Sequence, residues 1–216
     1  DFVHLGKHLG IDVHCALTFG DQPLGCGIGP ALEAREALFT LMGEGPPDVR
    51  EKAVSLAGML FELVGEIDGR SKAEEILRSR KAECKLREII AAQGGNYKVK
   101  PQDIPVGPEH AEVRAKEKGR VLWINTEGIV QVSRAAGTPK ETGSGILLHA
   151  KLGDVVAKDA ILFEVYAERS SKLESALELA RKLEPVVLSR KTEERMLLDQ
   201  YPAKIGERDK SFPFER

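Results

Sequence analysis

The glycine-rich loop at residues 20–30 has the residue types that best suit close contact with a ligand. Residues 25–29 read Gly-Cys-Gly-Ile-Gly, and glycines let a ligand approach backbone carbonyls and amides closely. The run is not GxGxxG, and it lacks the Lys-Ser/Thr pair of a phosphate-binding P-loop. A tight turn between a strand and a helix would need the same glycines, so a ligand loop and a structural turn are equally supported.

Two other groups could do chemistry, and both are weaker candidates. Cys26 lies in the loop, but no histidine is placed by spacing to activate its thiol, so we predict no nucleophile. His4 and His8 have the spacing of one helix face, yet no HExxH motif or third ligand accompanies them. A solvated histidine pair is the preferred interpretation. Cys15 lies inside an apolar run and is expected to be an inert core thiol.

The elements before the loop are predicted to place it at the edge of a sheet. Residues 2–9 favour a helix, and the apolar run at residues 11–19 predicts a buried strand. A helix followed by a strand is half of a parallel crossover unit. Ligands bind at the carboxyl ends of such strands, where residues 20–30 would lie.

Helical patterns continue to residue 92. Residues 31–42 predict an amphipathic helix that ends at Gly43. A second helix is expected from residue 48 to about 64, apolar around more than half of its surface and therefore well buried. One or two further helices are predicted over residues 71–92. Residues 1–95 are therefore interpreted as part of a mixed or parallel-sheet α/β domain with helices.

The pattern changes after a proline-containing segment at residues 96–110, which we interpret as a linker. Short runs such as GRVLWI, GIVQVS and GILLHA alternate with glycine-containing turns, which predicts antiparallel strands. A final helix is predicted at residues 171–183. The fold class predicted is thus α/β followed by α+β, with an α+β domain at 111–190 and a charged tail or assembly arm at 191–216.

Composition excludes several classes of function. The 216 residues include 32 basic and 34 acidic side chains, a balance that marks neither a nucleic-acid partner nor a membrane surface. No apolar run approaches the roughly 20 residues of a membrane helix. Three cysteines rule out a disulfide framework and favour a reducing, cytoplasmic compartment. The scarcity of asparagine and glutamine points weakly to a thermophile.

The run from residue 148 to residue 165 has the rhythm of the half-barrel in biotinyl or lipoyl carriers. A carrier needs a lysine at the tip of an exposed hairpin. The turns expected at residues 125–128 and 143–145 contain none. We therefore expect the scaffold without the swinging arm, and a carrier domain is a rival interpretation.

Four stretches together resemble the family of thymidine and pyrimidine nucleoside phosphorylases. They are ALT with QPLG within residues 16–25, GPALEAREA at 29–37, GEGP at 43–46 and AAQGG at 91–95. KPQDIP at 100–105 and SRAAG at 133–137 favour the archaeal branch, the AMP phosphorylases. The resemblance runs in order from residue 1 to about residue 188.

This resemblance implies both a fold and a reaction. The sheet of the α/β domain would include residues 11–19, and a hammerhead-like, barrel-sandwich-like α+β domain would follow. Members use inorganic phosphate to cleave the N-glycosidic bond of a nucleotide or nucleoside, releasing the base and a (deoxy)ribose 1-phosphate. AMP is the expected substrate ahead of thymidine. A thymidine phosphorylase proper and a stand-alone binding or assembly module are the alternatives.

The resemblance also implies partners and limits. It implies no organic cofactor, a nucleotide or nucleoside partner and a homo-oligomer, without nucleic-acid or membrane partners. The phosphate loop, general acid and base-binding residues of the family match no part of this sequence. We therefore assign no catalytic and no phosphate-binding residue, and we expect a C-terminal portion of a longer enzyme that is inactive alone.

Two site elements are implied by motif position. A structural cation would be held by the carbonyls of Leu24 and Gly27 and the carboxylate of Glu36, the alternative being that Glu36 only decorates its helix. Residues 137–145 form a candidate lid over the cleft, the alternative being a plain surface hairpin. The candidate lid residues are Gly137, Lys140, Gly143 and Gly145.

Overall fold

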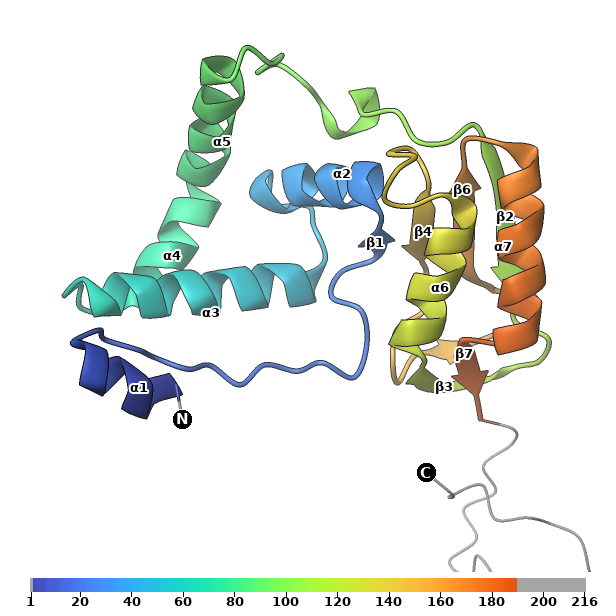
Figure 1. Ribbon diagram of the computed structural model, residues 1–216, viewed down its shortest axis with the longest axis horizontal. Coiled ribbons are helices and arrows are strands. Elements are labelled where there is room, and N and C mark those ends of the chain that lie inside the picture. Colours follow the sequence, from blue (N-terminus) through green and yellow to red (C-terminus); the bar gives the residue numbers. More distant parts are fainter. Residues whose placement is uncertain (1, 190–216) are drawn as a thin grey trace, which may run out of the picture.

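The computed structural model describes residues 2–189, and its helices and sheets form two adjoining parts (Figure 1). The first part is helical. An irregular segment with one short 3₁₀ helix, η1 (Pro101–Asp103), then leads into the second part. The helices of the first part are α1 (Phe2–Leu9), α2 (Pro30–Leu41), α3 (Pro47–Leu63), α4 (Gly69–Arg78) and α5 (Lys81–Ala92).

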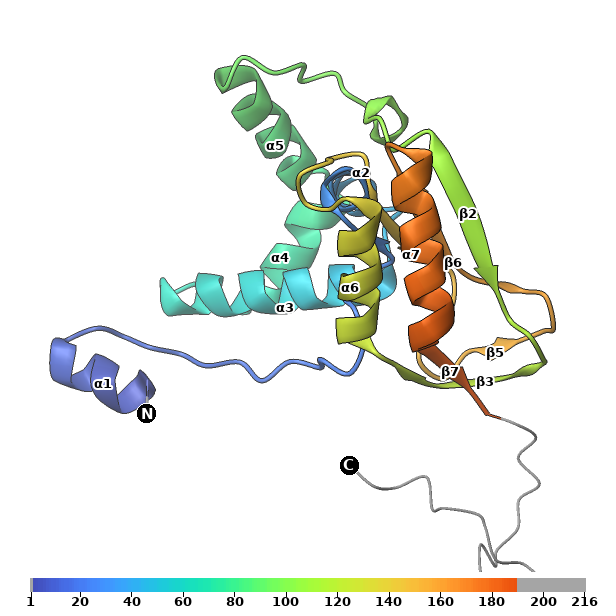
Figure 2. The same cartoon turned by 45° about the vertical axis from the view of Figure 1, so that its right-hand side comes forward.

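The second part combines two antiparallel sheets with the helices α6 (Thr126–Ala136) and α7 (Ser170–Leu183). The four-stranded sheet has the order β1 (Gly27–Ile28), β4 (Gly145–Leu148), β6 (Ile161–Ala167) and β2 (Glu109–Arg114). The three-stranded sheet has the order β5 (Val155–Val156), β3 (Gly119–Ile124) and β7 (Val186–Leu188). Helices α6 and α7 lie side by side and pack on the larger sheet (Figure 2). This mixture of helices and antiparallel sheets is an α+β arrangement.

The main core lies between these two helices and the sheet. Phe163 and Val165 point inward from β6, since alternate residues of a strand face one side. Ile129 and Val132 of α6 meet them with no exposed surface. Ala176 of α7 is equally buried and lets that helix approach closely.

The prediction of a strand at residues 128–133 is wrong, because these residues lie inside α6. The side chain of Asn125 accepts a hydrogen bond from the amide of Gly128 at 3.0 Å, which caps the helix. Residues 129, 132, 133 and 136 are buried, which is the spacing of a helix face. The β-branched residues suggested a strand, but the helical spacing and the cap determine the structure.

The strand predicted at residues 11–19 does not form within the described chain. The segment is extended and mostly exposed, and Leu17 is fully exposed. Cys15 is exposed too, so the prediction of a core thiol is wrong. The apolar pattern is real, but no strand among residues 2–189 lies beside the segment to pair with it.

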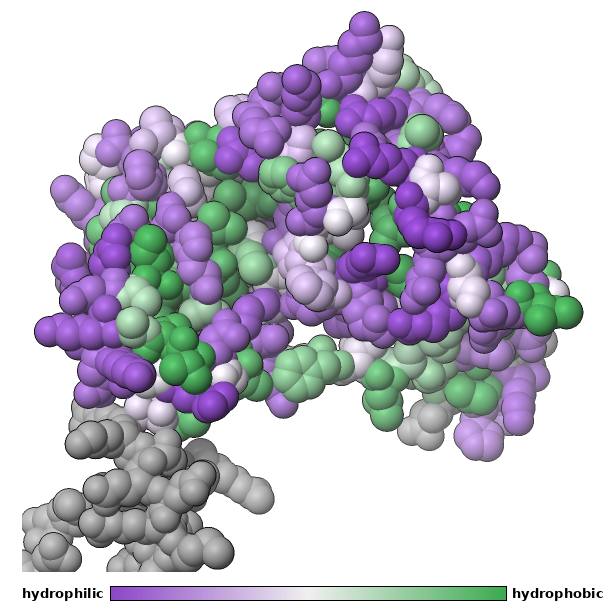
Figure 3. All heavy atoms as spheres, turned by 180° about the vertical axis from the view of Figure 1, so that it is seen from behind, coloured by the Kyte–Doolittle hydropathy of each residue, from purple (hydrophilic) through white to green (hydrophobic). Residues whose placement is uncertain are grey.

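Helix α3 is also less buried than its sequence predicted. Among its residues only Val54 and Gly58 are buried, while Leu60 is 65% exposed. Seen from behind, hydrophobic residues gather along the lower edge of the helical part (Figure 3). We call this set the exposed apolar face; its members are Phe2, Leu5, Leu9, Ile11, Leu17, Phe19, Leu56, Leu60, Leu63, Val64 and Ile67.

Other predicted elements agree with the structure. The helices predicted at residues 31–42 and 171–183 correspond to α2 and α7. Gly43 follows α2 with a φ of 90°, a left-handed conformation that favours glycine at a helix end. None of the described helices is long and apolar enough to cross a membrane. The tail or arm predicted at residues 191–216 lies outside the described residues.

Candidate functional site

The glycine-rich loop lies where the helical part joins the sheet of the second part. Its strand β1 pairs antiparallel with β4, so that Gly27 lies opposite Leu147. The carbonyl of Cys26 also accepts a hydrogen bond of 2.8 Å from the amide of Leu148. The loop therefore forms the edge of the antiparallel sheet, rather than the carboxyl end of a parallel strand.

Two carboxylates hold three consecutive amides of this loop. Glu36 Oε1 accepts hydrogen bonds from the amides of Cys26, at 2.7 Å, and Gly27, at 3.0 Å. Asp48 Oδ2 accepts from the amide of Gly25 at 3.1 Å. A Cβ atom at Gly25 would lie 1.9 Å from Glu36 Oε2, and the residue has a φ of 70°. The left-handed φ favours glycine at position 25, and any larger residue would also displace the Glu36 carboxylate from the loop amides.

Lys151 reaches the same loop from the second part. Its Nζ donates to the carbonyl of Pro23 at 2.8 Å and to the carbonyl of Gly25, and it lies 3.0 Å from Asp48 Oδ2. The amide of the next residue donates to Gln22 Oε1 at 2.8 Å. Side-chain and backbone contacts thus tie the turn after β4 to the loop.

The charges around the loop shift two pKa values. Burial acts to raise the pKa of Asp48, but the hydrogen bonds from Lys151 and the amide of Gly25 outweigh it and lower the pKa. Burial raises the pKa of the Cys26 thiol. The charge of Lys151 opposes that shift, and the charge of Glu36 adds to it. Cys26 therefore sits in an environment that disfavours a thiolate nucleophile.

The residues predicted to hold a structural cation are near one another but face other partners. Glu36 accepts a hydrogen bond from the amide of Gly27, whereas the prediction places the carbonyl of Gly27 beside it as a second ligand. The loop carbonyls that do face a positive charge belong to Pro23 and Gly25, and that charge is Lys151. These contacts fit a bound metal ion poorly. The assignment to Leu24, Gly27 and Glu36 stays a prediction.

The histidine pair of α1 has no shared ligand position among the described residues. The Nδ1 atom of exposed His8 lies 2.8 Å from the carbonyl of His4 and is satisfied there. No group of three or more His, Cys, Asp or Glu side chains within residues 2–189 could hold a metal ion.

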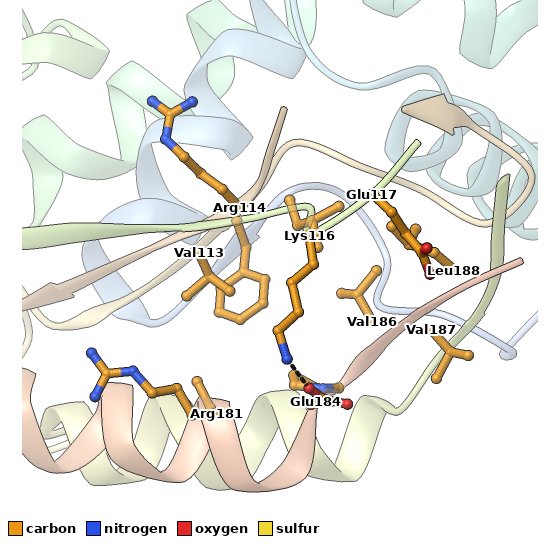
Figure 4. A pocket seen from close by; sticks show the side chains of 13 residues that line it. Val113, Arg114, Lys116, Glu117, Arg181, Glu184, Val186, Val187 and Leu188 are labelled. Atoms are coloured by element: carbon orange, nitrogen blue, oxygen red, sulfur yellow. Dashed lines mark hydrogen bonds and ion pairs between the residues drawn. The ribbon is translucent and has the colours of Figure 1, made fainter. Parts of the chain in front are cut away.

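Among the hollows on the described surface are two in different parts of the molecule. One, of about 390 Å³, runs between residues 16–24 and α3, and Asp48 is at its wall. The other, of about 460 Å³, lies in the second part beside the end of α7 (Figure 4). There Lys116 extends across to Glu184, to which it is bonded. Sequence reasoning found neither hollow, because each is built by segments that are distant in the chain.

The predicted lid loop, residues 137–145, connects α6 to β4. The amide of Gly143 donates to Glu168 Oε1 at 3.0 Å, and its carbonyl accepts from the amide of Gly107 at 2.7 Å. Within residues 137–145, the exposed residues are Pro139, Lys140 and Thr142. Movement of the whole loop as a lid would break these hydrogen bonds.

The remaining lid candidates are part of regular structure. Gly137 is the C-cap of α6, with a φ of 128°, and Gly145 begins β4 and is buried. A Cβ atom at Gly145 would lie 2.3 Å from the carbonyl oxygen of Ile28. Glycine at that position allows β1 to approach β4. The lid assignment stays a prediction.

Comparison with known proteins shows what this chain is similar to. Residues 121–185 match the model of the pyrimidine nucleoside phosphorylase C-terminal domain. The chain is 48% identical over 190 residues to AMP phosphorylase of Pyrococcus furiosus, covering 86% of this chain and 38% of that relative. AMP phosphorylase 1 of Archaeoglobus fulgidus is 44% identical over 191 residues (88% and 38%), and the Methanosarcina barkeri AMP phosphorylase 40% over 210 residues (95% and 40%).

The chain resembles a C-terminal portion of the archaeal AMP phosphorylases. The resemblance predicted from the sequence motifs is thereby confirmed. The chain spans about two fifths of the length of the curated relatives that it matches.

In the second part of the chain, sequence reasoning missed one polar cluster on the outer face of the larger sheet. Tyr166 donates to Glu164 Oε2 at 2.6 Å, and His149 Nε2 lies 2.7 Å from Glu164 Oε1. The rings of His110 and Tyr166 stack with centroids 5.7 Å apart. Side chains of the cluster thus join β2, β6 and the residue that follows β4. The signal in the sequence was the alternation along β6, which places Glu164 and Tyr166 on the same face of the strand.

This cluster predicts a pH dependence of stability. Burial, and then the hydrogen bond to Glu164, raises the pKa of Tyr166 to about 12. A raised pKa in the folded state stabilises the fold below the ordinary tyrosine pKa of about 10, and that contribution is lost as the pH rises through 12. Tyr166→Phe should lower the free energy of unfolding by about 1–2 kcal/mol at pH 7. The difference in free energy of unfolding between this variant and the parent, measured by urea unfolding, should become smaller between pH 10 and pH 12.

The matched control is Tyr97→Phe, since Tyr97 is about half exposed. It should match the parent within about 0.5 kcal/mol. A constant difference between the Tyr166→Phe variant and the parent across pH 7–12 would contradict the prediction.

Proposed function

We propose that this chain forms the C-terminal part of an archaeal-type AMP phosphorylase. That enzyme uses inorganic phosphate to cleave the N-glycosidic bond of AMP, in preference to thymidine, and gives the free base and the sugar 1-phosphate. It needs no organic cofactor. The observation that carries the proposal is the 48% identity over 190 residues to a relative named AMP phosphorylase. The three free cysteines are in keeping with a reducing, cytoplasmic compartment.

The chain's part in this reaction is positioning rather than bond breaking. The polar groups of the loop satisfy one another: Glu36 and Asp48 bind loop amides, and Lys151 binds loop carbonyls. None of these three contacts is directed at a substrate. A group that protonates the leaving base and a cradle for phosphate would therefore come from elsewhere, and this chain alone would be inactive.

The exposed apolar face supports the same proposal. Soluble monomers rarely gather so many exposed apolar side chains on one side, and Ile67 is 93% exposed here. We propose that the portion of the relatives that this chain does not match covers the face. Residues 11–19 would then join a parallel sheet, and residues 111–190 would form the hammerhead-like domain beyond a linker at 96–110. Assembly as a homo-oligomer belongs to the same proposal.

A complementation assay tests the function. The 216-residue chain is incubated with inorganic phosphate and either AMP or thymidine at elevated temperature, alone and with a separately produced segment of the Pyrococcus furiosus enzyme that precedes the matched region. We expect no base release by the chain alone, and adenine release from AMP when the two are mixed. The Pyrococcus segment alone is the control for residual activity.

The other outcomes identify the alternatives. Base release from thymidine but not from AMP by the mixture would favour a thymidine phosphorylase. A stable complex with no release of either base would favour a binding or assembly module. Clear turnover by the chain alone would contradict the proposal that its catalytic groups lie elsewhere. Light scattering on the active mixture would measure the oligomeric state.

A further inference from the structure

The loop at residues 22–27 has the oxygen arrangement of a cation site, and the cation in it is an amino group. Three oxygens face Lys151 Nζ: the carbonyls of Pro23, at 2.8 Å, and Gly25, and Asp48 Oδ2, at 3.0 Å. An ammonium has three N–H donors, so donors and acceptors match one to one. The single carboxylate also balances the single positive charge.

The stem of Lys151 is fixed independently of this contact. Its amide donates to Asp154 Oδ2 at 2.8 Å within the turn that follows β4. Gly153 gives the turn its left-handed residue, with a φ of 90°. The side chain is only 20% exposed. The turn therefore holds the ammonium group in place, unlike that of a mobile surface lysine.

A metal ion would find a poor donor set at this position. Hard divalent cations such as Ca²⁺ take about six to eight oxygen ligands, and the loop directs three oxygens at Lys151. Glu36, the carboxylate expected to bind the metal, already accepts two amide hydrogens. A metal placed nearby would also be repelled by the ammonium.

We propose that Lys151 is the structural cation of the glycine-rich loop and fixes the loop and the start of α3 to the second part. The proposal rests on contacts within the described residues and is independent of the proposed phosphorylase function. It makes a specific chemical prediction: without its amino group, the protein acquires a requirement for a small monovalent cation, which the parent lacks.

The test is chemical rescue of Lys151→Ala in the 216-residue chain. Thermal unfolding is followed in tetramethylammonium, potassium, ammonium and methylammonium chloride at equal ionic strength. The parent should unfold at the same temperature in all four salts. The variant should unfold about 3–6 °C lower in tetramethylammonium and recover at least half of the loss in ammonium or methylammonium.

Two control variants separate the proposal from general destabilisation. Lys151→Met keeps the length of the stem and fills the space, so it should be destabilised without recovery in any salt. Lys158→Ala removes an exposed lysine and should behave as the parent in every salt. Stabilisation of the parent by potassium over tetramethylammonium would overturn the proposal in favour of a metal at Leu24, Gly27 and Glu36. Loss of stability in Lys151→Ala without any ion-specific recovery would also overturn it.

A second measurement uses the parent protein alone and does not depend on the folding of any variant. The parent is treated briefly with acetic anhydride, and peptide mass spectrometry measures the acetylation rate of each lysine. Lys151 should react at least tenfold more slowly than Lys158, because its amino group is held by three acceptors and largely shielded. Equal rates for the two lysines would overturn the proposal.

Discussion

Replacing Phe163 with alanine is expected to lower the free energy of unfolding by about 3–5 kcal/mol. Phe163 is 1% exposed and lies on β6 between Val113 of β2 and Leu148 of β4. Its ring fills the space between the sheet and the two helices, and the closely packed neighbours cannot collapse fully into the cavity. Guanidinium unfolding at equilibrium, followed by far-UV circular dichroism, measures the loss.

The matched control is Phe19→Ala. Phe19 is 61% exposed in the extended segment, so its truncation leaves no cavity. The change should stay within about 0.5 kcal/mol of the parent. Similar losses from both variants would mean that the core does not lie where α6, α7 and the larger sheet meet.

Gly69→Ala is expected to cost about 1–3 kcal/mol by opening the crossing of α3 and α4. A Cβ atom at Gly69 would lie 2.1 Å from the carbonyl oxygen of Gly58 and 3.0 Å from the Cγ atom of Glu62. The first contact is with backbone, which cannot rotate away. Alanine favours helix over glycine by about 1 kcal/mol, so the clash must exceed that gain for the loss to appear.

Gly20→Ala is the control for this substitution. No atom lies within 4 Å of a Cβ at that position, and its backbone does not have a positive φ. The change should be neutral or slightly stabilising, because alanine restricts the unfolded chain. Hydrogen exchange should show that Gly69→Ala weakens protection in α4 while α6 keeps its protection. Unchanged stability of Gly69→Ala would contradict the close crossing.

The sequence predicted helices well where the helical periodicity and the residues at the helix ends agreed. Residues 31–42 combine a helical period with Pro30 at the start and Gly43 at the end, and α2 has these limits within one residue. The helix at 171–183 was predicted equally well. In both cases local propensity and core packing favour the same structure.

The failures have physical causes of two kinds. Residues 128–133 are rich in β-branched side chains, and a run this short satisfies a strand pattern as well as a helix pattern. Residues 11–19 failed for the opposite reason. A β-strand needs a neighbouring strand to pair with, and the apolar run itself does not show whether such a partner strand is present.

The site was predicted only in part. The glycines of the loop drew attention to residues 20–30, and the structure shows a role that was not predicted: the loop joins the helical part to the larger sheet. Lys151 and Asp48 were missed, because the lysine is 126 residues beyond the carbonyl of Gly25 that it binds. No spacing rule links residues so distant. A lysine before a tight turn gave no sign that its amino group would be buried against another part of the chain.

The pairing of β1 with β4 bears on the order in which the molecule assembles. Two residues of the early chain, Gly27 and Ile28, supply the edge of a sheet whose other strands all come after residue 108. Closing so long a chain segment costs conformational entropy, and two residue pairs alone offset little of that cost. The later strands would therefore nucleate first and capture the early segment last. The last step of assembly would then take place at the glycine-rich loop, where Lys151 and the backbone of Leu148 bind it, rather than at the proline-containing stretch that separates the two parts in sequence.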